Sequence, residues 1–401
     1  IDVTRQFAGD FAQTAYIKGS HNQSRDYFGT SVAIEGDTLV VSAYGEDGSS
    51  RGINNGDLAD NGASQSGAVF VFTRDAAGTW TEQAYIKSSN SDAGDEFGRA
   101  IALDGDTLAV GTYREQSASA GVNADETDNS LLNAGAVYVF TRDATGNWSQ
   151  QAYIKASNPS EQDWFGGTFR LGLSGDTLAV PAINEDTIAT DSGAVYIFTR
   201  DGDGNWSEQA LLKASNAGAG DHFGTSVAVE GDTLVVGAQR QEGDRGAAYV
   251  FSRDANGNWT ETQILNARYR DPDDFFGVDV AISGETIAVG AQGEASASRG
   301  IDGDETNNSA PFAGAVYIFN PDDQSNWTQT AYIKASNADA GDYFTTVALS
   351  GDLLAVGARI EDSSASGING DQDNNQVSGS GAGYVFVRDQ NGTWSQRSYI
   401  K

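Results

Sequence analysis

The sequence predicts an all-β fold, a β-propeller of four-stranded antiparallel blades, of which we count six. Three observations predict it. One phrase returns six times along the 401 residues, each copy divides into four short runs of β-forming residues, and turn residues separate these runs. Hydrophobic residues make up 39% of the chain, which is enough for a packed core, so an ordered fold is expected.

A Phe-Gly pair marks each copy of the repeat. The pairs are Phe28-Gly29, Phe97-Gly98, Phe165-Gly166, Phe223-Gly224 and Phe276-Gly277, and the sixth copy reads Phe344-Thr345. The expected repeat units are residues 28–87, 97–155, 165–213, 223–266, 276–334 and 344–401, within a single propeller domain of residues 1–401. A repeat of about 50 to 70 residues is typical of propeller blades.

The first three strands of a unit can be read from the first copy. Residues 30–34 lead to Gly36-Asp37, a two-residue hairpin signal, and "TLVVSA" at residues 38–43 follows as a nearly continuous apolar run. The third strand, "GAVFVF" at residues 67–72, places β-branched and aromatic residues on both faces. That pattern predicts a strand covered on both sides.

The fourth strand differs in character. It follows the connection "TRDAAGTW", whose glycine is expected to supply the positive φ of a short bulged hairpin. "WTEQAYIK" at residues 80–87 is more polar and alternates, so we expect it at the outer edge of the sheet. Lysine ends this strand, and at an exposed edge it would discourage pairing with other chains. The lysine recurs at Lys18, Lys87, Lys155, Lys213, Lys334 and Lys401.

One additional fourth-strand phrase, "FAQTAYIK" at residues 11–18, precedes the first unit. This strand either closes the ring by pairing with the last blade or belongs to a further blade. Seven blades therefore stay an alternative to six.

The recurring text "FG-x-SVA", "GDTLVVGA" and "GAxYVF" resembles the FG-GAP repeat of integrin α-subunit propellers and their bacterial relatives, from about Phe11 to Lys401. The resemblance implies a propeller used for adhesion or recognition outside the cell. The chain departs from the integrin pattern between the first and second strands. Integrin-type repeats often carry a calcium loop there, whereas this chain has minimal turns such as Gly36-Asp37 and Gly231-Asp232. The family's metal site is therefore not carried over to these positions.

Charge and composition exclude several function classes. The formal net charge is -32, and such a field repels nucleic acid and anionic lipid. No apolar run is long enough to cross a bilayer, so direct membrane insertion is not expected. The chain has no cysteine, which excludes disulfides and thiolate chemistry. The acidic composition fits an extracellular or cell-surface protein, alone or as part of a larger surface protein.

Strand parity predicts which face of the blades carries function. The loops between second and third strands and the crossings between blades share one face, while short uniform turns lie on the other. These loops are long in units 1, 2, 5 and 6 and short in units 3 and 4. Variable loops on a rigid scaffold usually carry function. We therefore expect an acidic wall with a notch at blades 3 and 4, binding a cell-surface protein or a polysaccharide.

Candidate ligand-binding residues occupy the variable position of the D-x-F-G crossing. A ligand entering the notch would stack on Trp164 and hydrogen-bond to His222, and Tyr27, Tyr343 and Glu96 are further candidates. The alternative interpretation is that these side chains pack between blades, since aromatic residues contribute large buried areas.

Candidate metal ligands come from the long acidic loops. Ca²⁺ takes six to eight oxygen ligands, and loops rich in Asp, Asn and Gly can supply them. The spacing is not that of an EF-hand, and Asx turns in solvated loops are the alternative interpretation. The candidate residues are Asp57, Asp60, Asp125, Asp128, Asp302, Asp304, Asp371 and Asp373.

Two further acidic positions recur in the units, which indicates a structural role. Each of these carboxylates is expected to accept backbone N–H bonds at a turn, because buried N–H groups must be paired. The aspartates are Asp26, Asp95, Asp163, Asp221, Asp274 and Asp342, and the glutamates are Glu46, Glu115, Glu185, Glu242, Glu294 and Glu361.

Catalytic motifs are missing from the sequence. The chain has two histidines, and neither a nucleophile elbow, a zinc-protease motif nor a phosphate loop occurs. We therefore expect a non-enzymatic adhesion or recognition module. A polysaccharide lyase or hydrolase with its site near Trp164 and His222 is the alternative, because such chemistry needs only two carboxyl groups. A structural spacer within a larger surface protein is a third possibility.

Overall fold

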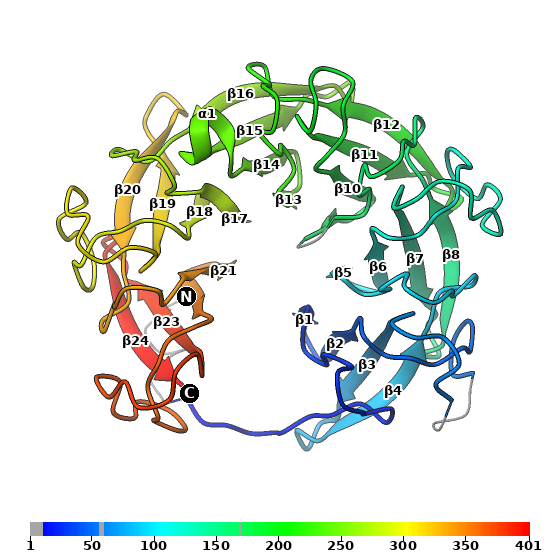
Figure 1. Cartoon of the computed structure of the whole chain (residues 1–401), viewed down its shortest axis with the longest axis horizontal. Helices are drawn as coiled ribbons and strands as arrows, with labels where there is room; N and C mark the ends of the chain where they lie inside the picture. Colours follow the sequence, from blue (N-terminus) through cyan, green and yellow to red (C-terminus); the bar gives the residue numbers. More distant parts are fainter. Residues whose placement is uncertain (1–10, 56–59, 168–169) are drawn as a thin grey trace. The chain divides into compact units, whose positions relative to one another are not determined.

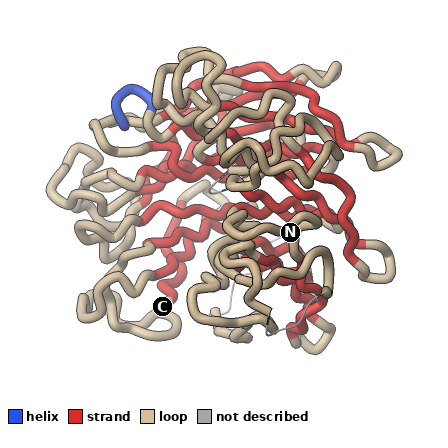
Figure 2. The backbone as a smooth tube through the Cα atoms, turned by 45° about the vertical axis from the view of Figure 1, so that its right-hand side comes forward, coloured by secondary structure: helices blue, strands red, loops and turns tan. Residues whose placement is uncertain are grey.

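The fold is described by a computed structural model that covers residues 11–55, 60–167 and 170–401. Over these residues the regular elements are strands and one short helix, joined by long loops and turns (Figure 2). The strands form six four-stranded antiparallel sheets, and within each sheet the strands are neighbours in the order in which they follow in the chain (Figure 1). The chain is therefore an all-β six-bladed propeller, as the sequence predicts.

The four strands of each sheet come from one repeat unit. Sheet one has β1 (Val32–Glu35), β2 (Thr38–Ala43), β3 (Ala68–Arg74) and β4 (Trp80–Ile86). Sheet two has β5 (Ala100–Asp104), β6 (Thr107–Thr112), β7 (Ala136–Arg142) and β8 (Trp148–Ile154). Sheet three has β9 (Gly172–Ser174), β10 (Thr177–Ala182), β11 (Ala194–Arg200) and β12 (Trp206–Leu212).

The later sheets follow the same plan. Sheet four has β13 (Ser226–Glu230), β14 (Thr233–Ala238), the helix α1 (Gln241–Asp244), β15 (Ala247–Arg253) and β16 (Trp259–Leu265). Sheet five has β17 (Phe276–Ser283), β18 (Thr286–Ala291), β19 (Ala315–Pro321) and β20 (Trp327–Ile333). Sheet six has β21 (Phe344–Ser350), β22 (Leu353–Ala358), β23 (Ala382–Arg388) and β24 (Trp394–Ile400).

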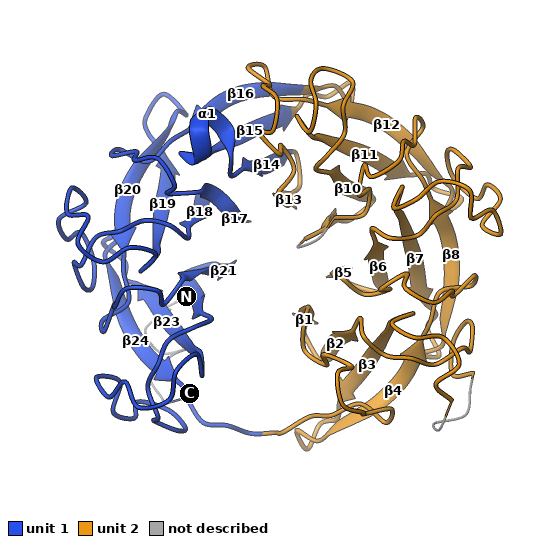
Figure 3. Cartoon of the chain, viewed as in Figure 1, with its two compact units in different colours: residues 1–14, 233–252, 260–401 blue, residues 15–232, 253–259 orange. Residues whose placement is uncertain are grey.

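Two compact units divide the chain (Figure 3). Unit 1 comprises residues 1–14, 233–252 and 260–401, and unit 2 comprises residues 15–232 and 253–259. Unit 2 thus contains the first three sheets together with β13, and unit 1 contains the last two sheets together with most of β14 to β16.

The predicted hairpins are confirmed. Gly36, in the two-residue loop between β1 and β2, has φ 54°, and Gly78, between β3 and β4, has φ 84°. In the longer turn, Asp75 Oδ1 accepts the backbone N–H groups of Ala77 and Thr79 at 2.9 and 2.8 Å. A register shift in the pairing of β3 with β4 marks the expected bulge. The local turn chemistry therefore sets these connections.

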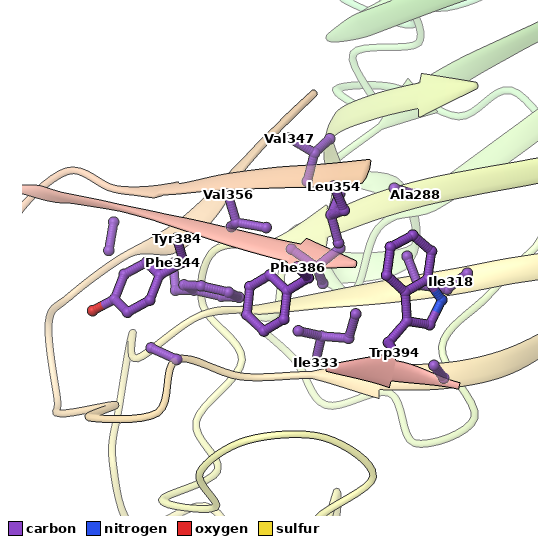
Figure 4. Close-up of a cluster of buried hydrophobic side chains, with 14 of the residues drawn as sticks. Ala288, Ile318, Ile333, Phe344, Val347, Leu354, Val356, Tyr384, Phe386 and Trp394 are labelled. Carbon is purple, nitrogen blue, oxygen red and sulfur yellow. The ribbon is translucent and has the colours of Figure 1, made fainter. Parts of the chain in front are cut away.

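The hydrophobic core lies between successive sheets. In unit 1, Phe344 and Phe386 of sheet six pack in one cluster with Ile318 and Ile333 of sheet five (Figure 4). In unit 2, Phe97 is fully buried, and its ring meets Tyr138 edge-to-face at 5.5 Å between ring centroids. The third strands of the first five sheets are buried on both faces, as predicted from their composition, whereas β23 of sheet six is only partly buried.

Polar contacts also tie neighbouring sheets together. In unit 2, the Arg142 guanidinium lies 5.3 Å from the centre of the Trp148 ring and its Nε pairs with Asp106 at 2.7 Å. Its Nη1 donates to Thr38 Oγ1 of the preceding sheet at 2.9 Å. Trp148 Nε1 donates to Gln83 Oε1 of that same sheet at 3.1 Å. The outer strand is thus held to the preceding sheet by directional bonds as well as by apolar packing.

The expected exposed position of the fourth-strand lysine is wrong. Lys87 is completely buried, and its Nζ donates to Glu46 Oε2 and to Ser66 Oγ, each at 2.6 Å. Lys155 pairs with Glu115 at 2.7 Å and is equally buried. The reason is that the loop following the second strand supplies a carboxylate to the lysine. A buried charge needs such a partner.

The N-terminal phrase also departs from expectation. Residues 11–18 form no strand in the structure, and no strand precedes β1 in the described part of the chain. The phrase has the alternation of a strand, but alternation does not supply the partner strand that a sheet requires. The six sheets are therefore those of the six Phe-Gly or Phe-Thr units.

Candidate binding face

The variable residue of every D-x-F-G crossing has a left-handed backbone conformation. Such a conformation is uncommon and costly for bulky residues, so the surrounding turn must impose it. The backbone N–H of Glu96 donates to the carbonyl of Gln65 at 2.9 Å, and that of Trp164 donates to the carbonyl of Asn133 at 3.2 Å. The φ angles are 55° for Tyr27, 58° for Glu96, 58° for Trp164, 55° for His222, 54° for Phe275 and 55° for Tyr343.

The aspartate before the variable residue stabilises this turn, as predicted. In every crossing one of its carboxylate oxygens accepts the backbone N–H of the residue three positions earlier. Asp26 accepts from Gln23, Asp95 from Asp92, Asp163 from Ser160, Asp221 from Gly218, Asp274 from Asp271 and Asp342 from Asp339.

Burial of this aspartate predicts a pH-dependent stability. Burial raises the pKa of Asp95 to about 7, so the folded chain binds a proton there more readily than the unfolded chain. Its contribution to stability is complete below about pH 4 and is lost as the pH rises to about 7. We expect Asp95→Asn to lose less stability than the wild type between pH 4 and pH 7, measured by urea unfolding.

An exposed aspartate supplies the matched control for that measurement. Hydrogen bonds from Thr145 and Asn147 lower the pKa of Asp143 to about 2, so its contribution is present above pH 4 and is lost as the pH falls toward 2. Asp143→Asn should therefore change the free energy of unfolding only in its dependence on pH below about pH 4. Identical profiles for wild type and Asp95→Asn would contradict the prediction.

Five side chains of unit 2 form a continuous row, here called the aromatic row: Tyr27, Tyr44, Arg99, Tyr113 and Trp164. Tyr27 stacks on Tyr44 with 4.9 Å between ring centroids. The Arg99 guanidinium lies 4.3 Å from the Tyr44 ring and 5.5 Å from the Tyr113 ring. Tyr113 meets Trp164 edge-to-face at 5.3 Å. The row thus links the first three blades through cation–π and aromatic contacts.

Glu96 anchors the row instead of standing free for a ligand. Its side chain is buried and forms ion pairs with Arg99 at 3.2 Å and with Arg114 at 2.9 Å. Tyr113 Oη lies 3.3 Å from Glu96 Oε2 and donates to it. The two arginines neutralise this carboxylate and fix the orientation of the rings above it.

Three of the four rings of the row remain partly accessible, whereas the ring of Tyr113 is buried. Tyr27 is 50% exposed, while Tyr44 and Trp164 are half-buried and the Arg114 side chain is 41% exposed. Partly exposed Tyr, Trp and Arg side chains on a fixed backbone are typical of residues that dominate binding interfaces. The row can therefore offer apolar ring faces and a cation to a ligand.

The remaining predicted ligand residues lie elsewhere. His222 is half-buried in unit 2, and its carbonyl accepts the N–H and the Oγ1–H of Thr225. Tyr343 belongs to unit 1, where it stacks on Phe312 at 5.6 Å and lies beneath Arg359. Of the five sequence candidates, the structure brings Tyr27, Glu96 and Trp164 together in unit 2.

Sequence reasoning missed Tyr44, Arg99, Tyr113 and Arg114. A signal was present, because the residue directly after the second strand changes from copy to copy as the D-x-F-G residue does. That position holds Tyr44, Tyr113, Ile183, Gln239, Gln292 and Arg359. Comparing the copies at this position would have found Tyr44 and Tyr113, two of the five residues of the row.

The acidic loop residues accept hydrogen bonds from their own loops. Asp60 Oδ2 accepts the N–H and hydroxyl of Ser49, and Asp128 Oδ2 accepts the N–H of Ala118 at 2.8 Å. These bonds lower the pKa of both carboxyls. Further acceptors of this kind are Asp125, Asp304 and Asp371, while Asp373 lies 3.6 Å from Arg299 and Asp57 lies outside the described residues.

Asp302 has a docking role within its loop. Its backbone has a φ of 53°, and its side-chain Oδ1 accepts the backbone N–H of Tyr332 at 2.9 Å. This bond lies next to a β-bridge between Ile301 and Ile333. The shared Gly-Ile/Val-Asn/Asp phrase of the long loops therefore docks each loop onto its fourth strand. Asn54, Asn123 and Asn369 make the same bond in the other long loops.

The residues present do not form a ready metal cage. Within the described ranges no group of three or more His, Cys, Asp or Glu side chains is arranged to hold a metal ion. The loop carboxylates already accept protein donors, which a bound Ca²⁺ would have to displace. Calcium binding by these loops stays a prediction.

Five of the six recurring glutamates behave as predicted, with one addition. Glu46 Oε1 accepts the backbone N–H of Gly48 at 3.0 Å, and its other oxygen binds Lys87. Glu115, Glu185, Glu294 and Glu361 likewise accept a backbone N–H two residues later. Glu242 pairs with Arg270 at 3.1 Å. The loop turn and the buried lysine thus share one carboxylate.

A family model described as FG-GAP repeat matches six segments of the chain, residues 11–72, 80–140, 148–198, 206–251, 259–319 and 327–386. The chain belongs to the FG-GAP repeat family. From the second match onward, each match begins at the fourth strand of one sheet and ends in the third strand of the next. An FG-GAP repeat of this protein therefore straddles two blades, which links successive sheets covalently.

One solved structure similar to this FG-GAP protein is the crystal structure of a protein from Lactobacillus plantarum. The two share 13% sequence identity over 92% of this chain and 84% of that chain, with a TM-score of 0.49. Among the described residues, no helix of the FG-GAP protein has the length and apolar character needed to span a membrane.

Proposed function

We propose that this FG-GAP protein is a non-enzymatic recognition module, which holds a protein or polysaccharide partner through the crossings and long loops that follow its second strands. The observation that carries the proposal is the aromatic row of unit 2. Three of its rings are partly exposed, and the crossing turns fix the backbones of Tyr27 and Trp164 at its two ends. A partner would meet a preorganised surface and would lose little affinity to ordering that surface.

Charge supports the proposed setting, the cell surface or the extracellular medium, within a larger surface protein. A net charge of -32 keeps the chain soluble and repels nucleic acid and anionic lipid. It also disfavours acidic polysaccharides, so a neutral glycan or a protein with a basic contact surface is the better partner.

The contacts of the recurring acids favour binding over turnover. A glycosidase needs two carboxyl groups that can reach the substrate. The crossing aspartates accept backbone N–H groups, the loop glutamates bind buried lysines, and Glu96 is paired with two arginines. The polysaccharide lyase or hydrolase alternative, with a site near Trp164 and His222, is therefore kept as an outcome of the binding experiment.

Removing the exposed end of the row should weaken binding. We expect Trp164→Ala to reduce affinity about 10- to 30-fold, since deleting an aromatic anchor costs about 2 kcal/mol or more. The probes are insoluble cellulose, chitin and xylan, and whole cells before and after protease treatment, each with and without Ca²⁺. Loss of cell binding after protease identifies a protein partner.

Tyr269→Ala is the matched control, because Tyr269 is 47% exposed and lies outside the row. It should bind as the wild type does, and both variants should unfold at the wild-type temperature. Equal binding by Trp164→Ala and wild type, or no binding to any probe with or without Ca²⁺, would contradict the proposal. Release of soluble sugar would favour the enzyme.

A further inference from the structure

Four buried polar side chains meet inside the second sheet of unit 2: Asn90, Glu115, Tyr138 and Lys155. Asn90 precedes the sheet, Glu115 follows β6, Tyr138 lies in β7 and Lys155 follows β8. Asn90 is 4% exposed and the other three are fully buried. This cluster plays no part in the proposed recognition function.

One carboxylate contacts both an amine and an amide. Glu115 Oε2 accepts from Lys155 Nζ at 2.7 Å, and Glu115 Oε1 accepts from Asn90 Nδ2 at 3.4 Å. Asn90 Nδ2 also donates to the carbonyl of Glu126 at 2.7 Å, which holds the amide plane in place. Tyr138 Oη donates to Asn90 Oδ1, so the amide oxygen already has a hydrogen-bond donor.

From this arrangement we infer that Asn90 and Lys155 are joined by an intramolecular amide bond between their side chains. Lys155 Nζ passes a proton to Glu115 and attacks Asn90 Cγ, which forms the new N–C bond. The negative charge that develops on Oδ1 is stabilised by the Tyr138 hydroxyl. Glu115 then delivers this proton to Nδ2 and the Cγ–Nδ2 bond breaks. The attacking nitrogen gives its second proton to the departing ammonia, which leaves as ammonium. No oxidant or other reactant is required.

Burial provides the conditions that this reaction needs. Burial lowers the pKa of Lys155, which favours the neutral, nucleophilic amine. Holding amine and amide on one carboxylate replaces a bimolecular encounter with an intramolecular step. In the first sheet Lys87 also binds the Ser66 hydroxyl, whereas Ala134 takes that position in the second sheet. Lys155 therefore lacks this competing hydroxyl.

The other sheets supply built-in comparisons. Two other sheets have the same four residue types and the same two bonds, from the asparagine amide to the glutamate and from the tyrosine hydroxyl to the asparagine. They are sheet three of unit 2, with Asn158, Glu185, Tyr196 and Lys213, and sheet six of unit 1, with Asn337, Glu361, Tyr384 and Lys401. Sheets one and five retain Lys87 and Lys334 with their glutamates but have His21 and Tyr269 where the asparagine would stand. These two sheets cannot form the bond.

Mass spectrometry of the full-length protein tests the inference. The intact mass should fall below the sequence mass by one ammonia for each bond formed. Trypsin should release residues 88–99 joined to residues 143–170, uncut after Lys155, because acylation removes the charge that trypsin recognises. Recovery of peptides 88–99 and 143–155 as separate species in full yield would overturn the inference.

Two variants separate this bond from other losses of ammonia. Glu115→Gln removes the proton carrier and should restore one ammonia to the mass, and Tyr138→Phe should slow formation of the branched peptide. Succinimides at Asn-Gly pairs lose the same mass, but all five such pairs, at Asn55, Asn61, Asn256, Asn369 and Asn391, are intact in Glu115→Gln. A loss that maps to those pairs overturns the inference. If Glu115→Gln fails to fold, the wild-type peptide map decides.

Discussion

Replacing Glu46 with alanine should lower the free energy of unfolding by about 3–5 kcal/mol, because it leaves the buried Lys87 ammonium without its carboxylate. Lys87 is fully buried, and the Glu46 side chain is 4% exposed. Burial lowers the pKa of Lys87, as expected at a site that disfavours an unpaired charge. Chemical unfolding of the variant, followed by tryptophan fluorescence, measures the loss.

A double variant tests the reason for the loss. Glu46→Leu combined with Lys87→Met removes both charges, and it should recover most of the stability, since apolar replacement of a whole buried pair is often nearly neutral. Asp37→Asn is the exposed control. It breaks the Arg74 pair, whose side chains are 43% and 67% exposed, and should cost about 0–1 kcal/mol. If Glu46→Ala costs no more than Asp37→Asn, the pair does not stabilise the blade.

Replacing Gly67 with alanine should destabilise unit 2 by more than about 3 kcal/mol, comparable to deleting a buried phenylalanine. Gly67 has φ 82° and lies against the backbone of Phe97 at the start of the next blade. A Cβ added there would come within 2.2 Å of the Phe97 carbonyl oxygen. The Phe97 backbone would have to move, and its ring would leave the core between the first two sheets.

Gly78→Ala measures the cost of placing alanine in a left-handed backbone conformation, without a new steric contact. Gly78 has nearly the same φ, 84°, but a Cβ added there would meet no other atom within 4 Å. Its replacement should cost only the strain of a left-handed alanine, about 1–2 kcal/mol. The difference between the two thermal unfolding temperatures measures the contact with Phe97. Equal temperatures would mean that the sheets can separate at Gly67 without loss.

The fold was readable from the sequence because its signals are local. Gly36-Asp37 and the glycine of "DAAGTW" are turn residues, and strand alternation needs only neighbouring positions. Six repetitions of one unit removed the ambiguity that a single short strand would leave. The same locality explains the error at residues 11–18, where strand-like alternation is present and no strand forms.

The candidate site was only partly readable. The changing residue in D-x-F-G led to Tyr27, Glu96 and Trp164, but the roles of these residues differ in the structure. Trp164 remains accessible, whereas Glu96 is buried between two arginines. Arg99 was not found, because its importance arises from contacts between blades that no local pattern encodes. Tyr113 lies at a position that changes from copy to copy, but its contact with Trp164 is visible only in the structure.

The sequence alone determined the strand content and the turns of the six repeat units, since these follow from alternation and turn chemistry within a few residues. Only the tertiary structure decided what the polar side chains do. Lys87 looked like an edge residue until Glu46, 41 positions earlier, was seen beside it. The sequence made Asp302 a candidate metal ligand, which stays a prediction, and the structure shows that its side chain docks the loop onto the fourth strand. The long loops bring these partners together. A buried polar group needs a hydrogen-bonding partner, and that partner can be distant in the sequence.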